Sequence, residues 1–198
     1  TVSGGDKVVI SFKKQNTAAN NPFTDLEGHW AKDTVLNAVG QGLFSGTSAT
    51  TFGPNMPVTR GMLVTVLHRM EGKPTGGTTP FTDVAAGQYY TDAVAWAASQ
   101  NVVAGMSATT FAPNASITRE QMAAILYRYA QNKGQDTSKR ADLSSFADAD
   151  SVSAYAKEAM SWANAAGLIS GRSTIELAPK GTATRAEAAA ILMRFLGK

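Results

Sequence analysis

Three arginines occupy matching places in a motif that the chain carries three times, and their chemistry is that of anion binding. They are Arg60, Arg119 and Arg185, each directly after a threonine and six residues after a proline. Apolar residues follow at the i, i+3, i+4, i+7 spacing of one helix face, which predicts each arginine at the first position of a helix. The helix dipole disfavours a cation there, whereas the N–H groups of a helix start attract anions. The arginines therefore indicate a bound anion, either a carboxylate of the chain or one of a ligand. Salt bridges that tie neighbouring repeats together are the alternative.

The threonine before each arginine is predicted to cap its helix, because its hydroxyl can accept a hydrogen bond from the first turn. The caps are Thr59, Thr118 and Thr184. Three residues on, Gln121 and Glu187 would complete a capping box in the second and third copies, whereas Met62 in the first copy cannot. A looser helix start presents its N–H groups less well. We therefore expect the arginine of the first copy, Arg60, to contribute less to ligand binding than its two counterparts.

The composition excludes several classes of function. The 198-residue chain has a formal net charge of +3 and scattered basic residues, which does not indicate nucleic-acid binding. It has no cysteine and only two histidines, His29 and His68, in no ligand-spaced cluster, so we expect no metal site, cofactor or serine triad. No apolar run approaches the roughly 20 residues of a membrane span. No signal peptide is present, and Thr1 is interpreted as an internal cut in a longer protein.

Internal repeats govern the expected architecture. We place them at residues 23–75, 80–135 and 145–198, each with two helices and an intervening loop. The first helices are expected to start near Trp30, Tyr89 and Tyr155 and to end near Gly42, Asn101 and Gly167, residue types that tolerate a left-handed C-cap. Buried loop residues are expected at Phe52, Phe111 and Leu177, before the Thr-Arg helices.

The expected fold is all-α. One helix pair has too small a core to be stable by itself, so three pairs are expected to share a helical core. Equivalent packing around an axis would give pseudo-three-fold symmetry, a pseudo-trimer within one chain, with similar grooves between neighbours. A linear helical array is the alternative. Residues 1–22 differ from the rest: Asp6 to Lys13 are predicted to form a short strand. We interpret this segment as the tail of an upstream domain or a linker, or as a strand that docks on the repeats.

The ordered set of motifs resembles the S-layer homology domain. The set is Phe-x-Asp, an aromatic residue at the first helix, Gly-(x)3-Gly, Phe-x-Pro and Thr-Arg-Ala-Glu, three times over roughly residues 22–198. The resemblance implies a secreted three-repeat, all-α module with pseudo-three-fold symmetry at the bacterial cell wall or S-layer surface. It also implies the partner, which is secondary cell wall polysaccharide bound in grooves between repeats, often through a pyruvate-ketal N-acetylmannosamine unit.

The resemblance further implies which residues line those grooves. Besides the arginines they are an aspartate (Asp25, Asp83 and Asp148), an aromatic residue (Trp30, Tyr89 and Tyr155) and a glycine (Gly46, Gly105 and Gly171). A ketal pyruvate is a fixed anion suited to an arginine, an acid can accept sugar hydroxyl bonds, and an aromatic face can cover the apolar face of a sugar. Each type has a structural alternative: the aspartate caps a turn, the aromatic residue lies in the core, and the glycine serves a turn of positive φ.

Two departures from the family pattern bear on the grooves. Gly61 and Met62 stand where Ala-Glu is usual, which weakens the helix start of the first copy. Arg172 follows Gly171 in the third repeat, an extra charge that could add to a groove or block it.

The leading function is a non-catalytic anchor that binds a cell-wall glycan. A self-assembly module that acts through protein contacts in a surface lattice is the alternative, and the oligomeric state is not predicted. The repeated acids could in principle pair as glycosidase carboxylates. Catalysis requires differently tuned groups, however, and the chain offers near-equivalent triplets, so we expect no enzyme activity.

Overall fold

The computed structural model describes residues 21–197, and these residues form helices joined by irregular loops. The helices are α1 (Lys32–Gly40), α2 (Arg60–Met70), α3 (Thr91–Ser99), α4 (Arg119–Asn132), α5 (Lys157–Ala165) and α6 (Arg185–Phe195), with 3₁₀ turns at Thr24–Leu26, Ala149–Ser151 and Ala154–Ala156. This part of the chain has isolated bridges but no β-sheet, so the all-α prediction is confirmed. None of its helices is long and apolar enough to cross a membrane. The strand predicted near the N-terminus lies outside the described residues.

The Thr-Arg helices begin where their caps predict. Thr59, Thr118 and Thr184 are the N-caps of α2, α4 and α6, and each hydroxyl accepts the N–H of the third helical residue. The reciprocal bond from a side chain back to the cap forms at Gln121 and Glu187, which completes the predicted capping boxes in α4 and α6. The arginines are the first residues of these helices, as expected.

The other three helices begin two residues after the aromatic positions and end at left-handed residues. Those residues are Gly42 (φ 71°), Asn101 (φ 56°) and Gly167 (φ 70°), as the sequence predicted. After α1 the chain forms a Schellman motif, because Gly42 N–H donates to Val39 and Leu43 N–H to Ala38. This turn directs Leu43 and Phe44 into the core, where both are buried.

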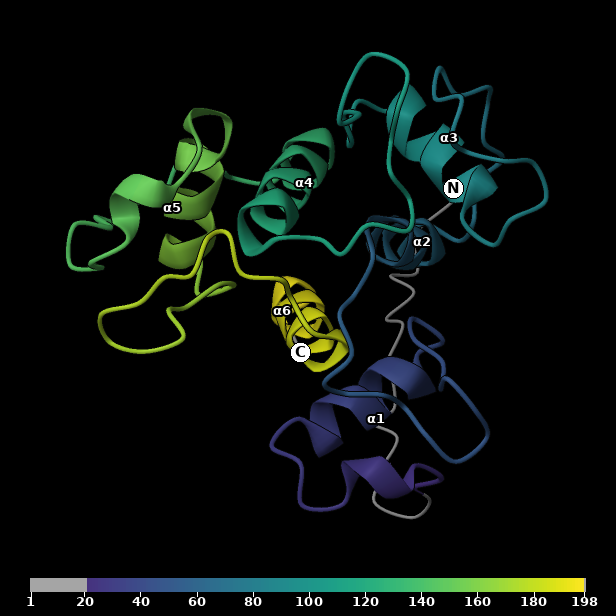
Figure 1. Ribbon diagram of the computed structural model, residues 1–198, viewed down its shortest axis with the longest axis horizontal. Coiled ribbons are helices and arrows are strands. Elements are labelled where there is room, and N and C mark those ends of the chain that lie inside the picture. Colours follow the sequence, from purple (N-terminus) through teal and green to yellow (C-terminus); the bar gives the residue numbers. More distant parts are fainter. Residues whose placement is uncertain (1–20, 198) are drawn as a thin grey trace, which may run out of the picture.

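The strongest helix contacts join different repeats. The pairs are α2 with α3, α4 with α5, and α6 with α1, so the first helix of each repeat packs against the Thr-Arg helix of another. Figure 1 shows α2, α4 and α6 around the middle of the molecule and α1, α3 and α5 outside them. Because α6 of the third repeat packs on α1 of the first, the array is closed, and the linear alternative is wrong.

A ring of three backbone hydrogen bonds lies where the repeats meet. Val58 N–H donates to Ala183 (2.9 Å), Ala183 N–H to Ile117 (3.0 Å), and Ile117 N–H to Val58 (2.9 Å). All three residues are fully buried. This cyclic order is what the expected pseudo-three-fold arrangement requires, although the rotational symmetry itself stays a prediction.

The first two N–H groups of each Thr-Arg helix also bond to another repeat. In α2, the Arg60 N–H donates to Ala115 (3.0 Å) and the Gly61 N–H to Pro113 (2.8 Å). The same bonds join α4 to Gly181 and Pro179, and α6 to Met56 and Pro54. The proline before each arginine motif thus supplies a carbonyl to the helix start of another repeat.

Gly61 allows one of these helix starts to come close to its neighbour. A Cβ there would lie 3.0 Å from the Pro113 carbonyl oxygen and 3.1 Å from the Tyr90 ring. A Cβ would therefore crowd α2 against the second repeat, and the glycine avoids this although glycine is a poor helix former.

The repeats share one core. The expected loop residues Phe52, Phe111 and Leu177 are fully buried, and the buried apolar side chains of all three repeats form a single cluster. Each repeat therefore depends on its neighbours to bury its apolar surface.

We predict that the three repeats unfold as one unit. Removing residues 146–198 deletes α5 and α6, opens the backbone ring and leaves α1 and α4 without their helix partners. A 1–145 fragment should therefore lack the cooperative thermal transition that the full chain shows by circular dichroism. A sharp melt of the fragment near the temperature of the full chain would contradict a shared core.

Candidate ligand-binding grooves

The three arginines are buried and hold neighbouring repeats together. Their exposed fractions are 4%, 5% and 7% for Arg60, Arg119 and Arg185. In each, Nε and Nη2 donate to two carbonyls of one loop in another repeat. The acceptors are Phe111 and Ala104 for Arg60, Leu177 and Ser170 for Arg119, and Phe52 and Ser45 for Arg185. The arginines do tie repeats together, but through carbonyl hydrogen bonds, so the salt-bridge alternative is wrong for Arg60 and Arg185.

The expectation that helix N–H groups remain available to an anion is also wrong. The first two are taken by carbonyls of another repeat and the third by the threonine cap. What remains is Nη1 of each arginine, which donates no hydrogen bond to a described residue. Because no fully buried side-chain nitrogen in the described part lacks a partner, these Nη1 groups reach the surface.

Aromatic rings cover two of the guanidinium groups. The Arg60 guanidinium carbon lies 4.6 Å from the centre of the Phe111 ring, and that of Arg185 lies 4.5 Å from the centre of Phe52. Burial lowers the pKa of all three arginines below its ordinary value, but an arginine remains charged in proteins. Each is therefore a fixed cation with one edge left for a ligand.

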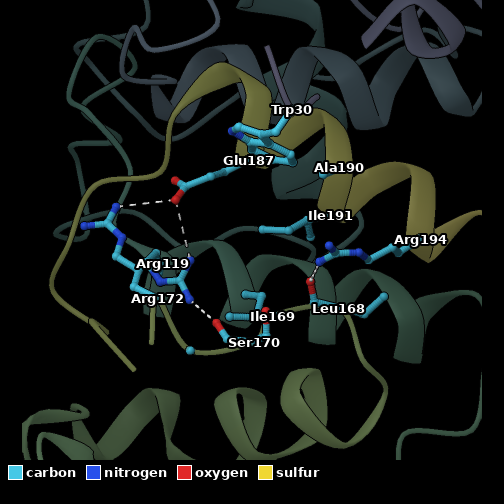
Figure 2. A pocket seen from close by; sticks show the side chains of 11 residues that line it. Trp30, Arg119, Leu168, Ile169, Ser170, Arg172, Glu187, Ala190, Ile191 and Arg194 are labelled. Atoms are coloured by element: carbon cyan, nitrogen blue, oxygen red, sulfur yellow. Dashed lines mark hydrogen bonds and ion pairs between the residues drawn. The ribbon is translucent and has the colours of Figure 1, made fainter. Parts of the chain in front are cut away.

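A cavity at Arg119 is built by all three repeats. This Arg119 groove has a volume of about 270 Å³. Its walls are Trp30 of the first repeat, Arg119 of the second, and residues 168–172 with Glu187, Ala190, Ile191 and Arg194 of the third. Figure 2 shows Glu187 between the two guanidinium groups of Arg119 and Arg172. The carboxylate Oε1 lies 4.0 Å from Arg119 Nη1 and 3.6 Å from Arg172 Nη2.

The predicted aromatic residues are on the surface, so the core alternative is wrong. Trp30, Tyr89 and Tyr155 have exposed fractions of 65%, 56% and 55%. Trp30 lines the Arg119 groove, and the electrostatic partners of the tyrosines are Arg60 for Tyr155 and Arg185 for Tyr89. Each arginine is therefore joined by an aromatic side chain from the repeat that neither contains the arginine nor supplies its carbonyl acceptors.

Two further candidate grooves follow from these correspondences. The Arg60 groove combines Arg60, Gly105, Gln121 and Tyr155, and the Arg185 groove combines Arg185, Gly46, Met62 and Tyr89. Glu187 of the Arg119 groove corresponds to Gln121 and Met62, the third residues of α4 and α2. Glu187 completes the capping box of α6 and lines the groove of Arg119, an arginine of another repeat. By the same correspondence, the missing box at Met62 would bear on the Arg185 groove.

The predicted aspartates hold the loops that the arginines bond to. Asp83 accepts the N–H groups of Phe111 (2.8 Å) and Ala112 (2.7 Å), and Asp25 and Asp148 do the same for Phe52 and Leu177 and the residues after them. Burial would raise the pKa of Asp83, but these N–H bonds and the Arg60 charge outweigh it and hold the pKa below the ordinary 3.8. A role of these carboxylates in sugar binding stays a prediction.

The predicted glycines are required by close packing rather than by positive φ. A Cβ on Gly46, Gly105 or Gly171 would lie 2.2 to 2.4 Å from a backbone oxygen two residues on, and 2.5 Å from the phenylalanine that opens the repeat. Their φ angles are outside the left-handed region, so that alternative is wrong. Gly171 lines the Arg119 groove directly.

A second set of three arginines was not predicted from the sequence. Arg69, Arg128 and Arg194 each lie nine residues after a motif arginine. Arg194 lines the Arg119 groove, and Arg128 is an electrostatic neighbour of Arg60. The repeated spacing could have revealed them. Arg172, the extra charge, does line a groove and donates to the Thr182 carbonyl (2.8 Å).

Comparison with known proteins identifies the same three units. A sequence model of the S-layer homology domain matches residues 22–61, 80–123 and 145–189. The chain is 33% identical over 177 residues to an amylopullulanase of Thermoanaerobacterium thermosulfurigenes. It is 32% identical over 184 residues to the surface-layer 125 kDa protein of Lysinibacillus sphaericus, and 31% over 195 residues to an endoglucanase of Bacillus sp. (strain KSM-635). These matches cover 89%, 91% and 96% of this chain, but only 10%, 15% and 20% of those proteins.

We predict that Asp83→Asn destabilises the fold, because an amide cannot accept two N–H bonds with a full negative charge. Because Asp83 is exposed and water screens its charge, the loss should be about 0.5–1.5 kcal/mol at neutral pH. Since the folded pKa of Asp83 is lowered, its contribution is present above the unfolded value and is lost as the pH falls through the folded one.

Urea denaturation at pH 7 and at pH 3 measures this effect. The deficit of Asp83→Asn should shrink at the lower pH, whereas the exposed Asp92→Asn, near the start of α3, should stay close to the parent at both. An equal deficit at both pH values would show that the carboxylate charge does not stabilise the loop.

Proposed function

Because the chain belongs to the S-layer homology domain family, which is a non-catalytic module that anchors proteins at the bacterial cell surface, we propose that its grooves bind pyruvylated cell-wall polysaccharide. The observation that supports this most directly is the Arg119 groove, where a buried arginine and an exposed tryptophan line one cavity of about 270 Å³, and Nη1 of that arginine donates no hydrogen bond to a described residue and lies 4.0 Å from Glu187 Oε1. A pyruvate ketal presents a carboxylate beside the apolar face of a sugar ring. The first suits the guanidinium and the second suits the indole.

The burial of the arginine favours an anionic ligand. Two of its nitrogens are committed to carbonyls, which fixes the guanidinium without neutralising its charge. Because this side chain is already fixed, it loses little conformational entropy when a carboxylate binds. Neutral sugar hydroxyls compete with water for each bond and gain less from it.

The chain spans a fifth or less of the relatives described above. Those relatives are named as polysaccharide hydrolases and as a surface-layer protein. One kind of module therefore occurs in proteins whose other parts differ. We propose that this chain serves as the wall-binding part of a larger surface protein, and that glycan rather than protein contact is its primary attachment. Sedimentation with purified cell walls, before and after removal of the polysaccharide, separates this from lattice assembly.

We predict that affinity depends on the ketal carboxylate. A hydrogen bond to a charged group contributes about 1.5–3 kcal/mol, so removal of the pyruvate or its conversion to a methyl ester should weaken binding about 10- to 150-fold. Titration calorimetry on matched glycans measures this. If the glycan without pyruvate binds within about threefold of the native one, the arginines do not form the anion site.

We further predict that Glu187 weakens anion binding in the Arg119 groove, because its carboxylate already lies beside both cations there. Glu187→Gln should raise the affinity for the pyruvylated sugar about two- to fivefold, the range of a partly exposed ion pair. Glutamine keeps the capping box, as Gln121 shows in α4. The matched reverse change, Gln121→Glu, should weaken the Arg60 groove.

The indole N–H signal of Trp30 in NMR titrations reports this groove separately, since Trp30 lines it and the other two tryptophans, Trp96 and Trp162, are buried. Unchanged or weaker binding by Glu187→Gln would mean that the carboxylate helps the ligand rather than competing with it.

A further inference from the structure

A second cavity lies between α4 and α5, beside Tyr155. This α4–α5 pocket has a volume of about 250 Å³, and its polar walls are Tyr127, Arg128 and Gln131 of α4 with Tyr155 and Glu158. Tyr155 and Arg128 hold the places in this pocket that Trp30 and Arg194 have in the Arg119 groove, and both also interact electrostatically with Arg60. The pocket and the Arg60 groove therefore meet at these two side chains.

Arg128 is the cation of this pocket that the fold does not use. Its counterparts Arg69 and Arg194 donate hydrogen bonds to the carbonyls of Leu43 (2.8 Å) and Leu168 (3.2 Å). Arg128 makes no hydrogen bond or ion pair with any described residue, although it is half-buried in the pocket wall. Its donors face a cavity rather than a carbonyl.

The remaining polar groups supply both acceptors and donors. Gln131, an exposed residue, also lies in the pocket wall, and its side-chain amide has no hydrogen-bond partner among residues 21–197. Glu158, on the opposite helix, has a side chain that is 77% exposed and lies 3.8 Å from Nη2 of Arg140. That nitrogen also donates to the Tyr127 hydroxyl (3.0 Å). One guanidinium, one carboxylate and one amide around a cavity suit an uncharged ligand rich in hydroxyl groups.

Tyr155 is fixed between the two cavities by a buried carboxylate. Its hydroxyl donates to Glu120 (3.2 Å), which is 3% exposed and also accepts bonds from Ser153 N–H (3.0 Å) and Lys180 (2.7 Å). Burial and Glu120 raise the pKa of Tyr155 to about 12. This hydrogen bond fixes the Tyr155 hydroxyl, so the ring has a defined place in the pocket wall.

We propose that the α4–α5 pocket is a second sugar subsite, which takes the uncharged neighbour of an anionic sugar bound in the Arg60 groove. This inference rests on the proposed function and extends it from one sugar unit to two. The corresponding positions elsewhere differ: Tyr127 and Gln131 are replaced by His68 and Gly72 in the first repeat and by Met193 and Gly197 in the third. The extended site therefore belongs to the Arg60 groove and not to the other two.

NMR titration of the full chain tests the subsite, because backbone amides of residues 124–131 and 154–159 report it separately from the other grooves. The probes are a pyruvylated N-acetylhexosamine and the same unit linked to one uncharged sugar. The disaccharide should bind at these amides about tenfold more tightly than the monosaccharide, as expected for two added hydrogen bonds.

Gln131→Ala and Glu158→Gln should each remove most of that gain while monosaccharide binding stays unchanged. The matched controls are Gln135→Ala, beyond the end of α4, and Asp92→Asn, at the place in α3 that Glu158 has in α5; both should keep the gain. Equal affinities for the two probes, or a gain that survives both pocket variants, would overturn the subsite and leave the proposed function standing. If the monosaccharide also fails to bind in any groove, both proposals fall.

Discussion

The structure depends on the ring of backbone hydrogen bonds among Val58, Ile117 and Ala183. Each residue gives its N–H to one repeat and its carbonyl to the other, so the ring exists only when all three repeats are present. The neighbouring helix starts also bond each repeat to the next, but in the opposite cyclic sense, first by backbone N–H groups and then by the arginine side chains. In a fully buried setting each unmade bond would cost about 1–3 kcal/mol, which makes a partly assembled ring unfavourable.

The same bonds shape the grooves. An aspartate holds a loop, the loop presents carbonyls, and the carbonyls fix an arginine that comes from another repeat, as in the series Asp83, Phe111 and Arg60. Binding and folding therefore share residues. This explains why the ligand-facing part of each arginine is only the edge that the fold leaves over, and why substitutions of the arginines would disturb both properties together.

The features that could be predicted from the sequence are those that depend on near neighbours in the chain. The caps at Thr59, Thr118 and Thr184, the left-handed helix ends and the buried Phe52 and Phe111 all follow from short patterns whose physical causes are local. The acceptors of the arginines could not be predicted in this way, because they are backbone carbonyls. Every residue has one, so no residue type indicates which carbonyl is used. Two further features could not be predicted without the folded structure. Trp30 lines the Arg119 groove although it belongs to another repeat, and Gly105 is required by close packing rather than by a turn.

The closure of the third repeat onto the first has a mechanical consequence for a module that holds a protein against a wall. Trp30 and Glu187 line one groove although most of the chain separates them in sequence. Tension that peels α6 from α1 would part these two walls, so the groove would open before the rest of the core was exposed. Conversely, a glycan seated between Trp30 and the third repeat would clasp the first and last repeats together. A bound glycan would then oppose the tension that attachment to the wall creates. The module without glycan would separate α6 from α1 at a lower force than the module with glycan bound.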